Sequence, residues 1–279
     1  MQFPFLKVRD PQKVFFLSLL IKPFKVGAIL FEEINSKLFI LSTNEVEADK
    51  DTSELLGEEL LTLADRVVSF VEGSMPKGAT VEKTIFSVPL TWVDEGLPAG
   101  RQGKIKKEYL AKLKKVCEDL GLVPIGYIVS IEAIVHFLQR SEGAPVSAIF
   151  VEVAQNKVFV YLVRAGKIIE VQAGEVENSI LKTVEGLLKG IESVDVLPSK
   201  IILLDYKGVE GIQQEFLSHQ WGKEIPFLHI PQVMILEKGF ENEATINGVA
   251  SQMELEVLQD VRASKSSPTE EEILGEALP

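Results

Sequence analysis

The chain has 279 residues, 46% of them hydrophobic, which is enough to bury the core of one large domain or two small ones. Its 41 acidic and 29 basic residues give a net charge of −12, and such a charge repels nucleic-acid phosphates and anionic lipid headgroups. We therefore expect no nucleic-acid partner. The single cysteine, Cys117, cannot form an internal disulfide, which indicates a reducing compartment and predicts a cytoplasmic protein.

An apolar run occupies residues 14–21, with Ser18 as its polar interruption and three basic residues before it. The run is much shorter than the ~20 residues that a membrane span requires. Lys22, Pro23 and Phe24 follow it, where a signal peptide would carry small residues for cleavage. We interpret the run as a short buried or partner-facing segment, with a membrane anchor as the alternative. Residues 1–24 are accordingly assigned to a lead segment.

Residues 25–142 form the first predicted half. Extended runs at 26–31 and 37–42, joined by Asn35 and Ser36, predict a β-hairpin. Leucine and valine recur at helical spacing from Leu56 to Val71, and residues 84–88 are typical of a strand. The glycine-rich stretch 96–103 predicts an inserted surface loop. A strand at 125–129 then leads into a short helix at 131–138.

An amphipathic helix is predicted over residues 105–120, and it carries the densest group of positive charges in the chain. Its lysines are Lys106, Lys107, Lys112, Lys114 and Lys115. We interpret them as a solvated helix face. A docking surface for an acidic partner is the alternative.

Residues 143–258 form the second predicted half. Strands at 146–153, 157–163 and 167–172, separated by short turns, predict a β-meander. A helix over 176–191, a strand at 201–204, a helix over 210–219, a strand at 225–230 and a last helix from about 245 to 258 complete it. Residues 259–279 are acidic and poor in apolar residues, which predicts a disordered tail. Meanders followed by helices indicate a mixed α/β fold with two similar halves.

The order of these elements resembles the actin-like ATPase superfamily, nearest its pilus-assembly PilM and cell-division FtsA branch. The resemblance covers roughly residues 25–254 and is carried by Ser87-Val88-Pro89, Asp119-Leu120-Gly121-Leu122, Ser130-Ile131-Glu132-Ala133 and Ala244-Thr245-Ile246-Asn247-Gly248-Val249-Ala250. It implies two ribonuclease H-like halves, each a β-meander with helices. The second half is reduced, because one helix stands where the family inserts a small subdomain before the strand at 201–204.

The resemblance also implies a nucleotide in the cleft between the halves, held by backbone amides of glycine-rich turns and by carboxylates that position a metal. In the first hairpin, Ile29 and Phe31 stand where the family has Asp-x-Gly. In the second meander, Glu152-Val153-Ala154 keeps the carboxylate but loses the glycine.

Three further positions complete the comparison with the family's nucleotide site. Gly174 stands alone where a glycine pair is expected, and Asp205 and Gly208 lie in the segment that matches the adenosine-contacting turn. We therefore interpret Glu152, Gly174, Asp205 and Gly208 as remnants of a nucleotide site. No catalytic residue and no metal ligand are predicted.

The resemblance implies a non-catalytic scaffold, a pseudo-ATPase of bacterial pilus assembly or cell division that needs no cofactor. Its partner would be the cytoplasmic segment of a membrane protein or a sibling subunit, which would bring it to the inner membrane without a span of its own. The alternative is an active ATPase that uses ATP and Mg²⁺ at an unorthodox site built on Glu152 and Asp205.

The environment of Glu152 bears on that choice. An ionised carboxylate on an apolar strand is costly without a partner, which favours a function, whereas a solvent-exposed position at a strand edge is the other interpretation. A metalloenzyme is not expected, because His136, His219 and His229 lie on different elements without ligand spacing.

Overall fold

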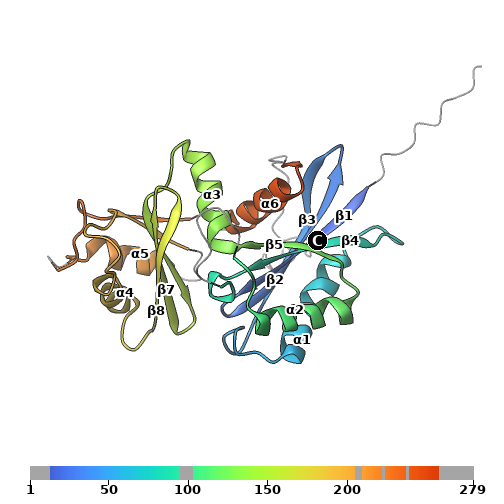
Figure 1. Cartoon of the computed structure of the whole chain (residues 1–279), viewed down its shortest axis with the longest axis horizontal. Coiled ribbons are helices and arrows are strands. Elements are labelled where there is room, and N and C mark those ends of the chain that lie inside the picture. Colours follow the sequence, from blue (N-terminus) through green and yellow to red (C-terminus); the bar gives the residue numbers. More distant parts are fainter. Residues whose placement is uncertain (1–12, 95–102, 205–208, 222–223, 237–238, 258–279) are drawn as a thin grey trace, which may run out of the picture.

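The computed structural model describes residues 13–94, 103–204, 209–221, 224–236 and 239–257. The predicted tail at 259–279, nearly all of the predicted loop at 96–103, and Asp205 and Gly208 lie outside these residues. The described chain forms two lobes, each built around one β-sheet, with two helices between them (Figure 1). The expected α/β architecture of two meander-containing halves is confirmed.

The first sheet has six strands in the order β11-β3-β2-β1-β4-β5. Their bounds are β1 Val14–Lys22, β2 Lys25–Ile34, β3 Lys37–Glu47, β4 Val81–Val88, β5 Pro124–Val129 and β11 Glu256–Val257. Strands β1, β2 and β3 form an antiparallel meander, whereas β4 pairs in parallel with β1 and with β5. Asn35 and Ser36 form the β2–β3 turn with φ of 54° and 63°, the backbone that a two-residue hairpin requires.

The apolar run at 14–21 lies inside this sheet. Strand β1 pairs with β2 on one side and with β4 on the other, and both of its faces are covered. A strand buried on both faces carries a continuous apolar run instead of an alternating one. Residues 14–22 are therefore a central strand of the first half, which corrects their assignment to a lead segment.

Helices cover both faces of the first sheet. Helices α1 (Gly57–Glu72) and α2 (Lys107–Leu120) pack on one face, and α3 (Ser130–Glu142) and α6 (Phe240–Gln252) pack side by side on the other (Figure 1). The last helix therefore begins about five residues before the predicted start. A short 3₁₀ helix, η1 (Leu90–Trp92), follows β4. Trp92 is fully buried and stacks on Tyr109 of α2 with ring centroids 4.4 Å apart, so it packs this helix against the end of β4.

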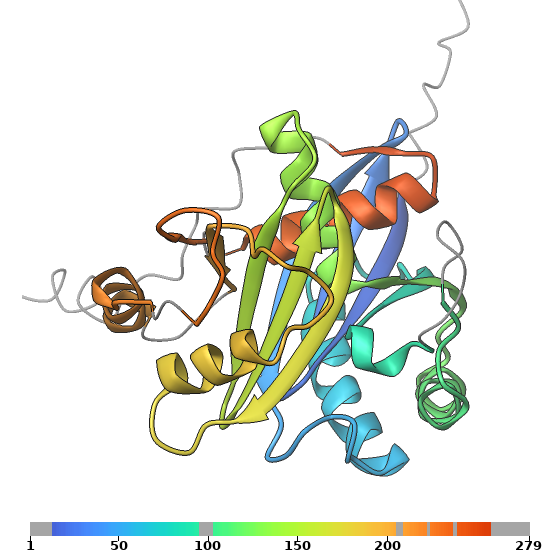
Figure 2. The ribbon, with the colours of Figure 1, turned by 60° about the vertical axis from the view of Figure 1, so that its left-hand side comes forward.

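The second sheet has five strands in the order β10-β9-β6-β7-β8. Their bounds are β6 Ala148–Ala154, β7 Lys157–Arg164, β8 Lys167–Glu175, β9 Lys200–Leu203 and β10 Gln232–Ile235. Helices α4 (Ile180–Lys189) and α5 (Val209–Ser218) cover its outer face, as Figure 2 shows. The strand predicted at 225–230 is wrong. Phe227 forms an isolated bridge to Leu197, and Leu228 and Ile230 are exposed.

The largest hydrophobic cluster joins the two lobes. It includes Leu17 and Leu30 of the first sheet, Ile134 of α3, and Phe150 and Tyr161 of the second sheet. Alternation along β6 and β7 directs one set of side chains toward the first lobe and the other toward α4 and α5. The inward-facing side of the second sheet thereby forms one wall of the space between the halves.

Candidate functional site between the two halves

Two β-turns, one from each sheet, meet at the loop of residues 48–54. The β1–β2 turn is held by hydrogen bonds from the Ala48 amide to the Phe24 carbonyl (2.8 Å) and from the Thr52 amide to the Pro23 carbonyl (2.7 Å). From the second half, the Gln155 side-chain amide donates to the Ala48 carbonyl over 2.9 Å. The loop therefore fixes the two turns relative to each other.

The first of these turns is not where the sequence analysis placed it. Ile29 and Phe31 lie within β2, paired with Ser18 and Phe16 of β1, and are 1% and 0% exposed. The two residues matched to Asp-x-Gly therefore lie in the hydrophobic core and not at the turn between β1 and β2, so that match is wrong. The turn nearest the second half is formed by Pro23 and Phe24, and proline has no amide hydrogen to offer a phosphate.

A cavity of about 290 Å³ lies between the two turns. It is lined by the first turn (Lys22, Pro23, Phe24, Lys25), the second turn (Glu152, Val153, Ala154, Gln155), the start of α3 (Ser130, Ile131, Ile134), and Glu47, Leu204 and Glu241. This cavity occupies the position where the resemblance places a nucleotide. Its volume is just below the roughly 300–1,000 Å³ typical of small-molecule pockets.

Lys22 is held at this cavity by two carboxylates. Its Nζ lies 2.5 Å from Oε1 of Glu45 on β3 and 2.7 Å from Oε2 of Glu241 on α6, and its side chain is 13% exposed. Burial alone would lower the pKa of Lys22, but Glu241 and Glu45 outweigh burial and raise it well above its usual range. Lys22 therefore remains charged and ties the start of the closing helix to the first sheet.

Glu152 lies beside this cluster on the central strand β6, not at a solvent-exposed strand edge. The Tyr161 hydroxyl donates a hydrogen bond to its Oε2 over 2.8 Å. Burial and the neighbouring Glu241 raise the pKa of Glu152 to about 7, against the opposing effects of Tyr161 and Lys22. Near neutral pH the carboxyl is therefore divided between its neutral and charged forms.

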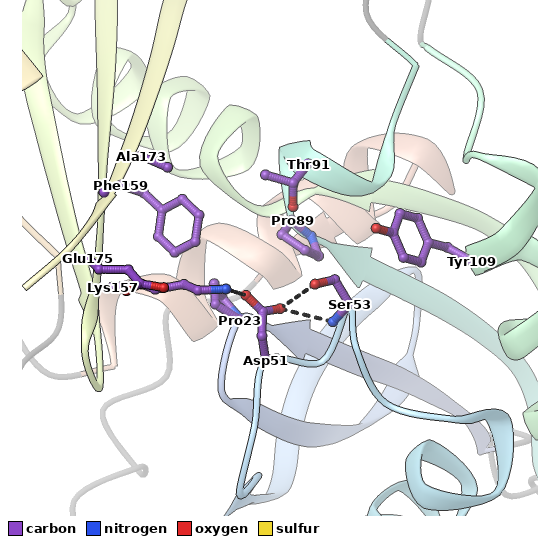
Figure 3. A pocket seen from close by; sticks show the side chains of 11 residues that line it. Pro23, Asp51, Ser53, Pro89, Thr91, Tyr109, Lys157, Phe159, Ala173 and Glu175 are labelled. Atoms are coloured by element: carbon purple, nitrogen blue, oxygen red, sulfur yellow. Dashed lines mark hydrogen bonds and ion pairs between the residues drawn. The ribbon is translucent and has the colours of Figure 1, made fainter.

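A second cavity, of about 260 Å³, lies on the other side of Pro23 and is drawn in Figure 3. Phe159, Ala173 and Glu175 of the second sheet form one wall. Pro89, Thr91 and Tyr109 of the first half form the opposite wall. Lys157, Asp51 and Ser53 lie at its floor. Both cavities thus belong to the seam between the two halves.

The floor of the second cavity is a network of polar contacts. Lys157 Nζ lies 2.9 Å from Oδ2 of Asp51, and the Ser53 amide and hydroxyl donate to Oδ1 of Asp51 over 2.9 and 2.7 Å (Figure 3). Burial opposes ionisation of Asp51, but the bonds from Lys157 and Ser53 lower its pKa. This ion pair is a second polar bridge between the halves.

The structure separates the predicted nucleotide-site residues. Glu152 lines the first cavity and Gly174 the second. A Cβ at Gly174 would lie 3.3 Å from Leu187 Cδ2 and 3.5 Å from Thr183 Cγ2, so this glycine permits close packing of α4 on β8. Leu204, the last described residue before Asp205 and Gly208, reaches the first cavity.

Sequence reasoning missed the charged residues that join the halves, Lys22, Glu241, Asp51 and Lys157. A signal was present for Lys22, because a single lysine directly after a long apolar run marks a strand end near other charges. Asp51 and Glu241 lie in a loop and at a helix start, where acidic residues are common.

The lysines of α2 are largely engaged within the protein. Lys106 donates to the Thr91 carbonyl, Lys112 to the Ser53 carbonyl, and Lys115 forms an ion pair with Glu58. Lys107 and Lys114 are exposed. Because three of the five lysines contact other parts of the protein, these contacts favour a structural role for this helix face over a docking surface for an acidic partner.

The residues at the seam do not fit Mg-ATP. A lysine ammonium stands between carboxylates where a metal would need free oxygen ligands, and Pro23 removes an amide from the first turn. Gln155 takes a φ of 53° in the second turn, where glycine would let a phosphate approach, and its side chain is bonded to Ala48. In the described part of the chain, no group of three or more metal-binding side chains occurs.

The fold is that of the actin-like ATPases. A PilM chain from a PilM–PilN type IV pilus biogenesis complex matches with a TM-score of 0.52 at 11% identity, covering 85% of this chain and 97% of that one. A Bacteroides thetaiotaomicron protein with an actin-like ATPase fold and unknown function matches with a TM-score of 0.45, 14% identity and coverages of 86% and 95%. An exopolyphosphatase from Cytophaga hutchinsonii matches with a TM-score of 0.42 at 10% identity, covering 75% of this chain and 72% of that one.

The likeness to the PilM chain supports the fold and leaves the activity open, because a fold does not by itself determine an activity. No protein-family model matches the sequence, and neither does any curated protein. Among the described residues, no helix is both long enough and apolar enough to cross a membrane.

Proposed function

We propose that this protein is a non-catalytic actin-like scaffold that binds a protein partner and does not use a nucleotide. The partner would be the cytoplasmic segment of a membrane protein or a sibling subunit, which would place the scaffold at the inner membrane of a bacterium. Pilus assembly or cell division is the setting that this branch of the fold suggests. The PilM–PilN complex supports a protein partner, because a chain of similar fold is found there with another protein.

The observation that carries the proposal is the Lys22 cluster. The ammonium of Lys22 bonds Glu45 and Glu241 at the turn where a nucleotide site needs a carboxylate for the metal and amides for the phosphates. A bound ATP would have to break these ion pairs and leave Glu241 facing its phosphates. Separating these pairs is unfavourable, because Lys22 is only 13% exposed and would lose both of its carboxylate partners.

Thermal unfolding with millimolar Mg-ATP tests the proposal directly. A ligand present at 100 times its dissociation constant stabilises a fold by about 2.7 kcal/mol, which corresponds to roughly 5–10 °C in a domain of this size. We expect the melting temperature to stay within about 1 °C of its value without nucleotide, far from the shift that mass action predicts for a ligand. A nucleotide-binding protein of the same fold, measured in parallel, serves as the positive control.

A nucleotide-dependent rise of several degrees would contradict the proposal and favour the ATPase alternative. In that case Glu152 would be the first carboxylate to replace, since it lines the cavity and titrates near neutral pH. Loss of the shift in Glu152→Gln would then assign the nucleotide to the cavity between the turns.

A further inference from the structure

Strand β8 is an edge of the second sheet. It pairs with β7 on one side, and no strand among the described residues pairs with its other side. An open edge presents main-chain amides and carbonyls that can pair with an extended segment of another protein. Its last residues, Ala173, Gly174 and Glu175, also form part of the wall of the cavity in Figure 3. An open edge and a side-chain cavity therefore lie next to each other.

Strand alternation determines which side chains of β8 reach this cavity. Ala173 lies opposite Phe159 and Glu175 opposite Lys157, and all four line the cavity. Gly174 lines the cavity with its backbone alone, because a side chain at this position would point to the other face, against Leu187 of α4. Ala173 is exposed, so a side chain brought in beside β8 can reach the ring of Phe159 across it.

The size and lining of the cavity suit a side chain rather than a cofactor. Its volume of about 260 Å³ is smaller than typical small-molecule pockets. Pro23, Pro89 and Phe159 make its walls apolar, while Thr91 and Tyr109 place hydroxyl groups at the side opposite β8 (Figure 3). Such a cavity accepts one large apolar or aromatic side chain.

The charges at this end of β8 are mainly negative. Of the charged residues that line the cavity, Asp51 and Glu175 are acidic and Lys157 is basic, and Lys157 is already bonded to Asp51 and Glu54. Glu175 and Glu177 are exposed. A partner segment with a basic residue two positions from its apolar anchor would place that residue on the same face as Glu175, and it would also be attracted by the net charge of −12.

We propose that the open edge of β8 docks an extended basic segment of the partner protein, which places one apolar side chain in the cavity between the halves. This inference rests on the proposed scaffold function and names its docking site. Main-chain pairing along β8 supplies affinity. Because Glu175 lies on the cavity face two residues from Ala173, the cavity and Glu175 together favour a segment with a basic residue two positions from its apolar anchor.

Synthetic peptides test this geometry without knowledge of the natural partner. The probe is a fluorescein-labelled Gly-Lys-Thr-Phe-Thr-Lys-Gly peptide, in which both lysines share the face of the phenylalanine, and its counterpart has glutamate in place of every lysine. We expect fluorescence anisotropy to show at least tenfold tighter binding of the basic peptide. N-methylation of alternate backbone amides on one edge of the peptide should abolish binding, whereas methylation on the other edge should not, because one edge of a strand faces β8.

Three variants of the protein locate the site. Ala173→Trp fills the cavity and Glu175→Lys reverses the charge at its rim, so each should weaken binding of the basic peptide at least tenfold. Glu215→Lys makes the same charge change at an exposed position of α5 and should stay within twofold of the wild type. Melting temperatures of the three variants establish that each one is folded.

The docking site is overturned if the basic peptide does not bind. It is also overturned if Glu175→Lys and Glu215→Lys lose the same amount of affinity for this peptide. A dimer that Ala173→Trp dissociates, without peptide binding, also overturns it, because the occupant of the edge is then a second copy of the chain. The Mg-ATP experiment is independent of these results. A nucleotide-induced rise in melting temperature overturns the scaffold function, while peptide failure with no such rise removes only the docking site.

Discussion

Replacing Glu152 with glutamine should make the protein progressively more stable than the wild type as the pH rises from 5 to 8. The folded state raises the pKa of Glu152 from 4.5 to about 7, so the folded protein binds more protons than the unfolded chain in this range. Stability from this group is complete below pH 4.5 and is lost as the pH rises through 7. Glutamine stays neutral, and the gain of the variant should reach about 2 kcal/mol by pH 8, below the full effect of the pKa shift because the Glu152 side chain is only partly buried.

Urea denaturation at several pH values measures this difference. The lowered pKa of Asp51 and the raised pKa of Lys22 act in both proteins and therefore cancel in the comparison. Glu118→Gln, at an exposed position of α2, is the matched control. Its free energy of unfolding should change with pH as that of the wild type does. Parallel curves for Glu152→Gln as well would show that Glu152 titrates as an ordinary surface carboxylate.

Replacing Lys22 with methionine should lower the free energy of unfolding by about 2–3 kcal/mol. This is less than the roughly 3–5 kcal/mol for breaking a fully buried ion pair, because the side chains of Glu45 and Glu241 are 33% and 22% exposed. Methionine leaves Glu45 and Glu241 without their shared cation, next to the partly ionised Glu152. Chemical denaturation at pH 7.5 measures the loss. Lys25→Met, at the other end of the same turn, should cost about 1 kcal/mol or less.

A second substitution separates electrostatics from packing in this cluster. If repulsion among unpaired carboxylates causes the loss, adding Glu241→Met to Lys22→Met should restore part of the stability, because a packed apolar pair can replace an ion pair. Additive losses in the double variant would instead assign the effect of Lys22→Met to its methylene chain packing in the turn.

Repeating patterns in the sequence predicted most of the fold. Local sequence signals predicted several elements that the structure contains. They are the Asn35-Ser36 turn, the meander from β6 to β8, and the helices around Leu60 and Leu113. Strand β1 was misassigned because a uniformly apolar run does not distinguish a central strand from another buried segment. Its pairing with β4, which begins at Val81, has no local sign in the sequence, and its turn to β2 carries no glycine to mark it.

The candidate site was predicted only in part, for a related reason. Glu152 could be placed because it lies two residues before the end of β6, which a two-residue turn joins to β7 in a regular meander. The first turn was misplaced because Pro23 and Phe24 stand where a glycine would have marked it. The Asp-x-Gly position was therefore matched to Ile29 and Phe31, which lie within β2. The pairing of Lys22 with Glu241 joins residues more than two hundred positions apart, and only the folded arrangement of α6 brings them together.

The hydrophobic cluster that runs from Leu17 through Ile134 to Phe150 bears on how the protein responds to force. Turning one lobe against the other would expose these side chains to water, at about 25 cal/mol for each Å² of apolar surface, and would also break the ion pair between Lys157 and Asp51. A pull on one lobe is therefore passed to the other without rotation between them. If each lobe were bound to a different partner, the molecule would transmit force between them as a rigid body, without hinge motion between its lobes.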